Sequence, residues 1–219
     1  MKINNTSVKT FICMIITFAL ITGFVQIEGK RKWQKLFNGK DLKGWKQLGG
    51  TAKFYVENGQ IVGESKLGSP SSFLATEKLY SNFILELDLK GDTAMNSGIQ
   101  FRSNSLKDYK DGLVHGYQAE IDPTKRAWSG GIYDEGRRGW LKDLKDNEAG
   151  RKAYKNGEWN HYRIVAIGDS LSIWVNGIQT ATLKDSMTPT GFIAIQVHHT
   201  ENKRPMEIRC RNIRIQEMD

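Results

Sequence analysis

The sequence predicts an all-β sandwich, and three observations lead to that fold class. Many short segments alternate apolar and polar residues, as strands do when one face packs on a core and the other meets water. The dipeptides Asn58-Gly59 and Asn176-Gly177 each separate two such segments, which is a strong signal for a two-residue hairpin. Only residues 147–155 have a helical pattern. Many short strands joined by tight turns are typical of two packed antiparallel sheets.

The strands expected in the first half of the chain follow from this alternation. Leu85 and Leu87, for example, alternate with Glu86 and Asp88, so opposite faces of that segment are apolar and charged. Residues 38–41 are expected to form a turn and residues 65–72 a loop. The strands expected in this half are Trp33–Phe37, Phe54–Glu57, Gln60–Gly63, Phe73–Thr76, Asn82–Lys90, Asn96–Arg102 and Gly116–Asp122.

The second half begins with a long loop insertion, residues 123–158, which is rich in Gly, Lys, Arg and aromatic residues. Loops of this length in a compact domain are usually functional. The aromatic residues either stack on a ligand or anchor the loop, and the sequence leaves both open. In the last strand the alternation shifts phase at Asn212, which predicts a bulge. The aromatic residues are Trp128, Tyr133, Trp140 and Tyr154, and the expected strands are Trp159–Ile167, Leu171–Val175, Ile178–Leu183, Gly191–His199 and Glu207–Met218.

The amino terminus has the pattern of a secretory signal peptide. Lys2 and Lys9 precede an apolar run, residues 11–25, that is short for a membrane span. We expect cleavage between Gly23 and Gly29, so residues 1–28 form the signal peptide; an uncleaved signal anchor is the alternative. Cys13 lacks the small-residue motif of a lipid-anchor site. The mature protein is therefore expected in the periplasm or secreted, with no membrane attachment after cleavage.

Residues 29–219 are expected to form one domain, since roughly 190 residues are enough for a full core. Cys210 is the one cysteine of this part, so no internal disulfide can form. The formal net charge of +8 is spread along the chain and has no dense basic block beyond residues 30–32. A nucleic-acid-binding protein concentrates its charge on one face or helix, so no nucleic-acid partner is expected.

Polar side chains with a distinctive chemistry lie on one face of three expected strands. Amides, an arginine and carboxylates stand where an ordinary solvated face would carry interchangeable Lys, Ser and Thr residues. Such a set can bind many hydroxyl groups; a plain solvated sheet face is the alternative. These candidate residues are Asn96, Gln100, Arg102, Gln118, Glu120, Asp122, Gln196 and His198.

Acid–base chemistry is possible within this set. Residues two apart on a strand are separated by about 6.6 Å, so Glu120 and Asp122 could address one substrate as glycosidase carboxyl pairs do. Arg102 would keep one of them ionised. His198 is the best candidate for proton transfer because an unperturbed imidazole titrates near neutrality, although a strand histidine is often structural. His115 is expected at the rim of the site.

Several catalytic motifs are absent from the sequence. It contains no G-x-S-x-G, no H-E-x-x-H, no glycine-rich phosphate loop and no zinc-ligand spacing of Cys and His. No cofactor is therefore expected. A divalent metal held by Glu120, Asp122 and His198 stays possible, although their spacing matches no specific ligand motif.

A set of short motifs in fixed order resembles the 3-keto-disaccharide hydrolase family, and the resemblance runs from about Trp33 to Glu217. Each motif alone is weak, whereas the ordered set is specific. The motifs are Phe37–Trp45, Asn96–Arg102, Gly116–Asp122, Gly157–Asn160, Val175–Gly177, Gly191–His198 and Arg211–Ile215.

The resemblance implies a concanavalin A-like jelly-roll sandwich and an exported enzyme that cleaves 3-keto-glycosides. A separate sugar 3-dehydrogenase would supply the ketone, which acidifies the proton at C2 and permits elimination of the C1 oxygen, followed by hydration. On this basis Glu120 is expected to be the base, His198 the acid or water activator, and Arg102 the stabiliser of the enolate.

The remaining polar candidates, together with aromatic residues of the long insertion, are expected to bind the sugar: Asn96, Gln100, Gln118, Asp122, Gln196, Trp128, Tyr133 and His115. Two alternatives stay open. The same fold could serve as a non-catalytic carbohydrate-binding module, or Glu120 and Asp122 could hydrolyse an unoxidised glycoside.

Overall fold

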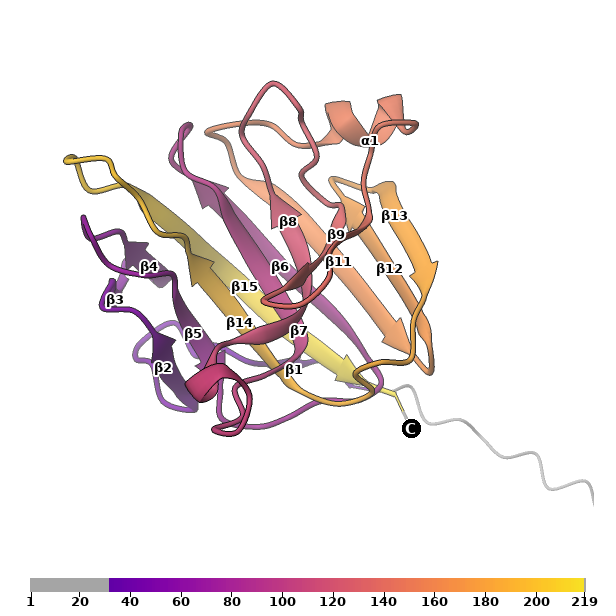
Figure 1. Cartoon of the computed structure of the whole chain (residues 1–219), viewed down its shortest axis with the longest axis horizontal. Helices are drawn as coiled ribbons and strands as arrows, with labels where there is room; N and C mark the ends of the chain where they lie inside the picture. Colours follow the sequence, from indigo (N-terminus) through magenta and orange to yellow (C-terminus); the bar gives the residue numbers. More distant parts are fainter. Residues whose placement is uncertain (1–31, 219) are drawn as a thin grey trace, which may run out of the picture. The chain divides into compact units, whose positions relative to one another are not determined.

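A computed structural model describes residues 32–218 and shows two antiparallel β-sheets that share one hydrophobic core (Figure 1). The all-β jelly-roll prediction is confirmed. The predicted signal peptide, residues 1–28, and the first residues of the predicted domain lie outside the described residues. Within the described part, no helix is long and apolar enough to cross a membrane.

The eight-stranded sheet follows the order β13-β12-β11-β6-β15-β4-β3, and β1 pairs with β15. Its strands alternate as expected, since Leu85, Leu87 and Leu89 are buried in the core. The bounds are β1 Gln34–Lys35, β3 Lys53–Glu57, β4 Gln60–Glu64, β6 Phe83–Gly91, β11 Asn160–Ile167, β12 Ser170–Val175, β13 Ile178–Lys184 and β15 Glu207–Glu217.

The seven-stranded sheet follows the order β10-β9-β8-β7-β14-β5-β2. Its inner face supplies Ile99, Phe101 and Tyr117 to the shared core. The bounds are β2 Trp45–Gly49, β5 Ser72–Thr76, β7 Ser97–Asn104, β8 His115–Ile121, β9 Ile132–Glu135, β10 Gly139–Lys142 and β14 Phe192–Val197. A short 3₁₀ helix, Lys110–Gly112, and one α-helix, α1 Glu148–Ala153, lie between strands.

The predicted turns and the predicted bulge are confirmed. Asn58 and Gly59 both have positive φ angles, 49° and 72°, and they join β3 to β4. Asn and Gly tolerate this conformation, which matches the twist of a hairpin. Asn212 has a φ of 54°, and the register of β15 against β6 shifts between Arg211 and Arg214.

The long loop insertion is more ordered than the sequence indicated. Residues 123–158 contain β9 and β10, which extend the seven-stranded sheet beyond β8, in addition to α1. The prediction of an extended loop is therefore wrong for residues 132–135 and 139–142. Strand β9 matters for function because it adds a further row of side chains beside β8.

Candidate functional site

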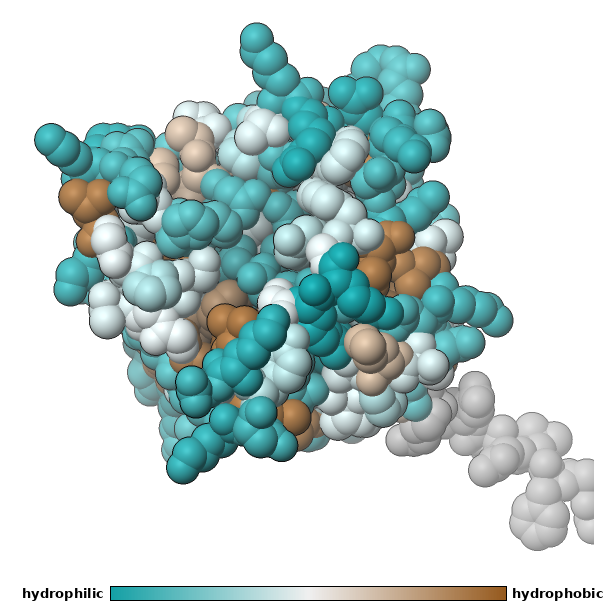
Figure 2. All heavy atoms as spheres, in the orientation of Figure 1, coloured by the Kyte–Doolittle hydropathy of each residue, from teal (hydrophilic) through white to brown (hydrophobic). Residues whose placement is uncertain are grey.

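The candidate site lies on the outer face of the seven-stranded sheet, the face that points away from the shared core. Register sets Gln100 of β7 opposite Gln118 of β8, and Gly98 opposite Glu120. On the other side of β7, Ala194 of β14 pairs with Gln100, so Gln196 lies on the same outer face. Hydrophilic residues occupy the middle of this face over β7, β8 and β14 (Figure 2).

A row of hydrogen bonds ends at the Glu120 carboxylate. The Ser103 hydroxyl donates to Gln100 Oε1 at 2.8 Å, and Gln100 Nε2 donates to Gln118 Oε1. Gln118 Nε2 then donates to Glu120 Oε2 at 2.7 Å, and Asn96 Nδ2 donates to Glu120 Oε1 at 2.7 Å. We call these five residues the amide row. The structure thus brings together four residues that the sequence predicted for the site.

Glu120 is only 5 % exposed although it faces away from the core. Burial raises the pKa of its carboxyl group, while the hydrogen bonds from Asn96 and Gln118 act in the opposite direction. Gly98 makes room for this arrangement. A Cβ atom on Gly98 would stand 2.2 Å from Gln118 Cδ, so the Gln118 side chain lies directly over the glycine.

A second carboxylate, Glu135 of β9, lies on the same face and was missed in the sequence. Gln196 Nε2 donates to Glu135 Oε2 at 3.4 Å. Burial and the neighbouring Glu120 charge raise the pKa of Glu135 to about 7. One signal could have found it: Glu135 follows the predicted site residue Tyr133 by two positions, so a strand would place both on one face.

An aromatic cluster borders the two carboxylates. The Trp140 ring contacts those of Tyr133 and Trp128 edge-on, with ring centroids 5.3 Å and 4.9 Å away. The Arg126 guanidinium lies over both indole rings, at 4.8 Å and 5.2 Å. Desolvation and then the charge of Glu135 raise the pKa of Tyr133, which places its phenol near that carboxyl group. Trp128 also packs against the hydrophobic core, so it anchors its segment as well.

His198 follows β14 directly and is partly buried. Its Nδ1 lies 2.8 Å from the His199 carbonyl oxygen, and a carbonyl can only accept, so Nδ1 carries the proton in the neutral ring. Burial lowers the pKa of His198. His198 is therefore a neutral imidazole near pH 7 whose Nε2 is an acceptor.

Arg102 does not face the amide row, so the predicted placement is wrong. Its φ is 46° and the β7–β8 register shifts after Phe101, which breaks the alternation that the prediction assumed. The buried guanidinium donates to the carbonyl oxygens of Ser81 at 2.6 Å and Gly168 at 2.7 Å, and to Asn82 Oδ1 at 3.1 Å. It joins two loops and is not beside the carboxylates as an enolate stabiliser would be.

Asp122 follows the last residue of β8 directly, so it lies in the loop and not in the strand as predicted, although its charge still helps to raise the pKa of Glu120. The Asp122 carboxylate accepts from Thr124 Oγ1 at 2.7 Å and from Arg126 Nε at 2.8 Å. These bonds hold the pKa of Asp122 below its usual value against the effect of burial. Within residues 32–218, no three His, Cys, Asp or Glu side chains converge as a metal site requires, so Glu120, Asp122 and His198 do not form one.

His115 is buried and does not form a rim. Its Nδ1 lies 2.8 Å from the Leu113 carbonyl oxygen, and its ring packs on Tyr109 with centroids 4.1 Å apart. The extra residue of the β7–β8 bulge lies in β7, between Phe101 and Asn104, and His115 pairs with Asn104 at the end of that bulge.

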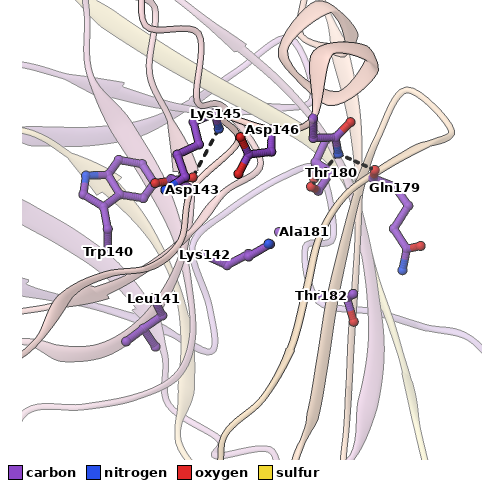
Figure 3. Close-up of a pocket in the computed structure, with 11 residues that line it drawn as sticks. Trp140, Leu141, Lys142, Asp143, Lys145, Asp146, Gln179, Thr180, Ala181 and Thr182 are labelled. Atoms are coloured by element: carbon purple, nitrogen blue, oxygen red, sulfur yellow. Dashed lines mark hydrogen bonds between the residues drawn. The ribbon is translucent and has the colours of Figure 1, made fainter.

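A groove of about 520 Å³ lies between the β10–α1 segment and the edge strand β13 (Figure 3). Asn147 links the two sides of this groove, because its Nδ2 donates to the carbonyl oxygens of Gln179 at 3.2 Å and Thr180 at 2.9 Å. Lys142 extends across the groove toward Ala181. None of the charged residues that line it is buried, and none belongs to the predicted site, so the groove lacks the enclosed carboxylates of the outer face.

Comparison with solved structures shows the same fold in carbohydrate-related proteins. A candidate glycosyl hydrolase from Parabacteroides distasonis has a TM-score of 0.62 and 21% identity, with 85% of this chain and 94% of that chain covered. The carbohydrate-binding module CBM66 from Bacillus subtilis has a TM-score of 0.61 and 19% identity, with 84% and 100% covered. A Bacillus licheniformis β-glucanase has a TM-score of 0.56 and 11% identity, with 88% and 100% covered.

Comparison with curated protein sequences finds no match. A family model does match, over residues 32–216, and it describes a 3-keto-α-glucoside-1,2-lyase-like domain. The match covers nearly all of the described residues, including the amide row, both carboxylates and His198. The resemblance seen in the sequence is thereby confirmed. This chain is a carbohydrate-active jelly-roll protein that belongs to the 3-keto-α-glucoside-1,2-lyase-like domain family.

Proposed function

We propose that this protein cleaves 3-keto-glycosides at the outer face of the seven-stranded sheet. The observation that carries the proposal is the presence of two carboxylates, the buried Glu120 and the partly exposed Glu135, beside a row of amides on one sheet face. Amides bind sugar hydroxyls, and a carboxyl group whose pKa is raised to about 7, as in Glu135, can exchange protons near neutral pH. Membership of the lyase-like family supports the choice of substrate.

The reaction is an elimination followed by a hydration. A base removes the C2 proton, the electron pair of that bond moves to the C3 ketone, and the C1–O bond then breaks as the leaving oxygen takes a proton from solvent. Water adds to C1 and a proton returns to C2, so the sum is hydrolysis. The ketone is supplied by a separate sugar 3-dehydrogenase, an oxidising enzyme of the same pathway.

The amide row stabilises the enolate and holds the ring. Asn96, Gln100 and Gln118 each carry two N–H donors, and the hydrogen bonds within the row use one from each. The second donor of each is directed to a hydroxyl or to the developing enolate oxygen. His198 acts at the hydration step, because neutral Nε2 can take a proton from the attacking water.

The test compares a 3-keto disaccharide with the same disaccharide unoxidised, using the purified mature protein with and without a chelator. Release of monosaccharide from the keto form alone is expected. Glu120→Gln should reduce it at least about tenfold, because the hydrogen bonds that Glu120 accepts from Asn96 and Gln118 hold the amide row in place. Glu148→Gln, on the exposed face of α1, is the matched control and should retain full activity. Equal release from both sugars would indicate a conventional glycosidase, and loss with chelator would show that a metal takes part.

A second function is favoured by the aromatic cluster and by the similarity in fold to CBM66. Rings such as Trp140 and Tyr133 can stack on a pyranose without any chemistry. The protein would then be a non-catalytic sugar-binding module of an exported system. Calorimetric binding of the unoxidised disaccharide, with no cleavage of either form, would support this function over the lyase.

A further inference from the structure

Glu135 and Glu120 lie on one face, yet their carboxylates differ in access. Both Glu120 oxygens accept an amide hydrogen bond within the amide row, and the residue is 5 % exposed. Glu135 is partly exposed and receives a single long hydrogen bond, from Gln196 Nε2 at 3.4 Å. Of the two carboxylates, Glu135 is therefore the one that a substrate can reach without breaking the hydrogen bonds around it.

Gln196 supplies an independent indication of a ligand. Its side chain is fully buried, and Oε1 has no hydrogen-bond partner in the part of the chain that the structure describes. A buried acceptor without a donor is costly, so such atoms usually mark a place where a water or a ligand binds. Because Nε2 points to Glu135, the free Oε1 lies on an amide fixed beside that carboxylate.

We infer that Glu135 removes the C2 proton of the 3-keto sugar and that Gln196 Oε1 accepts a hydrogen bond from a hydroxyl of the same ring. This inference rests on the proposed function and names the base for it, in place of Glu120. The proton from C2 moves to a Glu135 oxygen while its electron pair forms the enolate. The proton on the partly exposed Glu135 carboxyl exchanges with solvent, and Glu135 delivers a solvent-derived proton to C2 after water has added to C1, so the carboxylate is regenerated.

Glu120 acts on Glu135 through its charge. The charged and titratable groups that interact with Glu135 are Glu120 on β8 and Asp134 and Tyr133 on β9. Burial and the Glu120 charge raise the pKa of Glu135 to about 7. A base works only when ionised, so activity is expected to rise with pH through about 7 and to fall about tenfold per unit below it.

Hydrogen exchange at C2 tests the inference apart from overall turnover. The full mature protein is incubated with the 3-keto disaccharide in D₂O, and deuterium at C2 is measured by mass spectrometry beside product release. Glu135→Gln is expected to lose exchange and cleavage at least about 100-fold while it still binds the sugar. Glu135→Asp should retain part of both activities. Gln196→Ala should raise KM more than it lowers kcat, and Glu148→Gln should match the wild type.

Each outcome separates the two proposals. A wild type that cleaves the keto sugar and a Glu135→Gln variant with the same rate and pH profile would overturn the role of Glu135 and leave the proposed function in place. A wild type without cleavage or exchange would overturn both. Circular dichroism of each variant checks that the fold is retained, and Glu135→Asp provides a second reading if Glu135→Gln unfolds.

Discussion

Arg102 is a buried cation that donates hydrogen bonds to three neutral oxygens. It joins the Ser81–Asn82 segment before β6 to the Gly168 turn between β11 and β12. Desolvation lowers its pKa, so the hydrogen bonds offset the cost of burying the charge. Arg102→Ala is expected to lower the free energy of unfolding by about 3 kcal/mol, because a large buried side chain is removed and three part-buried acceptors lose their donor.

Urea denaturation measures this change, and turnover per folded molecule is measured beside it. The turnover should stay within about twofold of the wild type because Arg102 lies away from the amide row. Arg204→Ala is the control: Arg204 is an exposed arginine paired with Asp92 at 2.6 Å, and its loss should cost less than about 1 kcal/mol. A large loss of turnover in a stable Arg102→Ala protein would restore the sequence-based assignment.

The sequence could identify Glu120, Gln118, Gln100 and Asn96 because strict alternation holds along most of β7 and β8. It could not place Arg102 or His115. Arg102 lies in the bulge of β7, where counting by two fails, and His115 was expected to precede its strand but is the first residue of it. The sequence did not predict Glu135 for another reason. The four residues of β9 lie among Gly, Lys and Arg residues that are typical of a loop.

At the scale of elements, Gly98 controls how closely the Gln118 side chain can lie on β7. The glycine has an ordinary strand backbone, so alanine brings no backbone strain, but its Cβ would stand 2.2 Å from Gln118 Cδ. Gly98→Ala is therefore expected to displace Gln118 from Glu120 and to lower kcat/KM at least about tenfold on the 3-keto disaccharide. The melting temperature should change much less than activity does.

Gly91→Ala is the matched control for this prediction. Gly91 ends strand β6 of the other sheet, and a Cβ there would meet the Ile208 Cδ1 methyl at 3.2 Å, which is a milder contact with a flexible group. The Gly91→Ala substitution should lower the melting temperature and leave kcat/KM unchanged. If Gly98→Ala has the kcat/KM of the wild type, catalysis does not depend on the position of the Gln118 side chain over Gly98.

At the scale of the whole molecule, the sandwich was predictable because periodicity and turn chemistry agree along the chain. Asn58-Gly59 and Asn176-Gly177 adopt the backbone that their types allow, and the alternating apolar residues Phe83, Leu85, Leu87 and Leu89 of β6 enter the core. The pairing order of the strands was not predictable from these signals. Neighbours such as β14 and β5, or β15 and β6, are far apart in the chain, and their contact depends on packing of the complete sheets.

Cys210 reports on the stability of this sandwich as a unit. It is fully buried in the middle of β15, between β6 and β4, and burial raises the pKa of its thiol well above the usual range. A thiol reagent can therefore reach it only after the two sheets separate. In the mature protein, labelling of Cys210 should be slower than in an unfolded chain by roughly 10³-fold or more, which is the factor that ordinary domain stability implies.

Labelling is followed by mass spectrometry as a function of urea, and the free energy from labelling should equal that from circular dichroism. Leu79→Cys is the control, because Leu79 is 50% exposed and a thiol there should react without unfolding. If Cys210 reacts at a lower urea concentration than the global transition, β15 opens locally. The eight-stranded sheet would then not unfold as one cooperative unit, because β15 pairs with β1, β4 and β6.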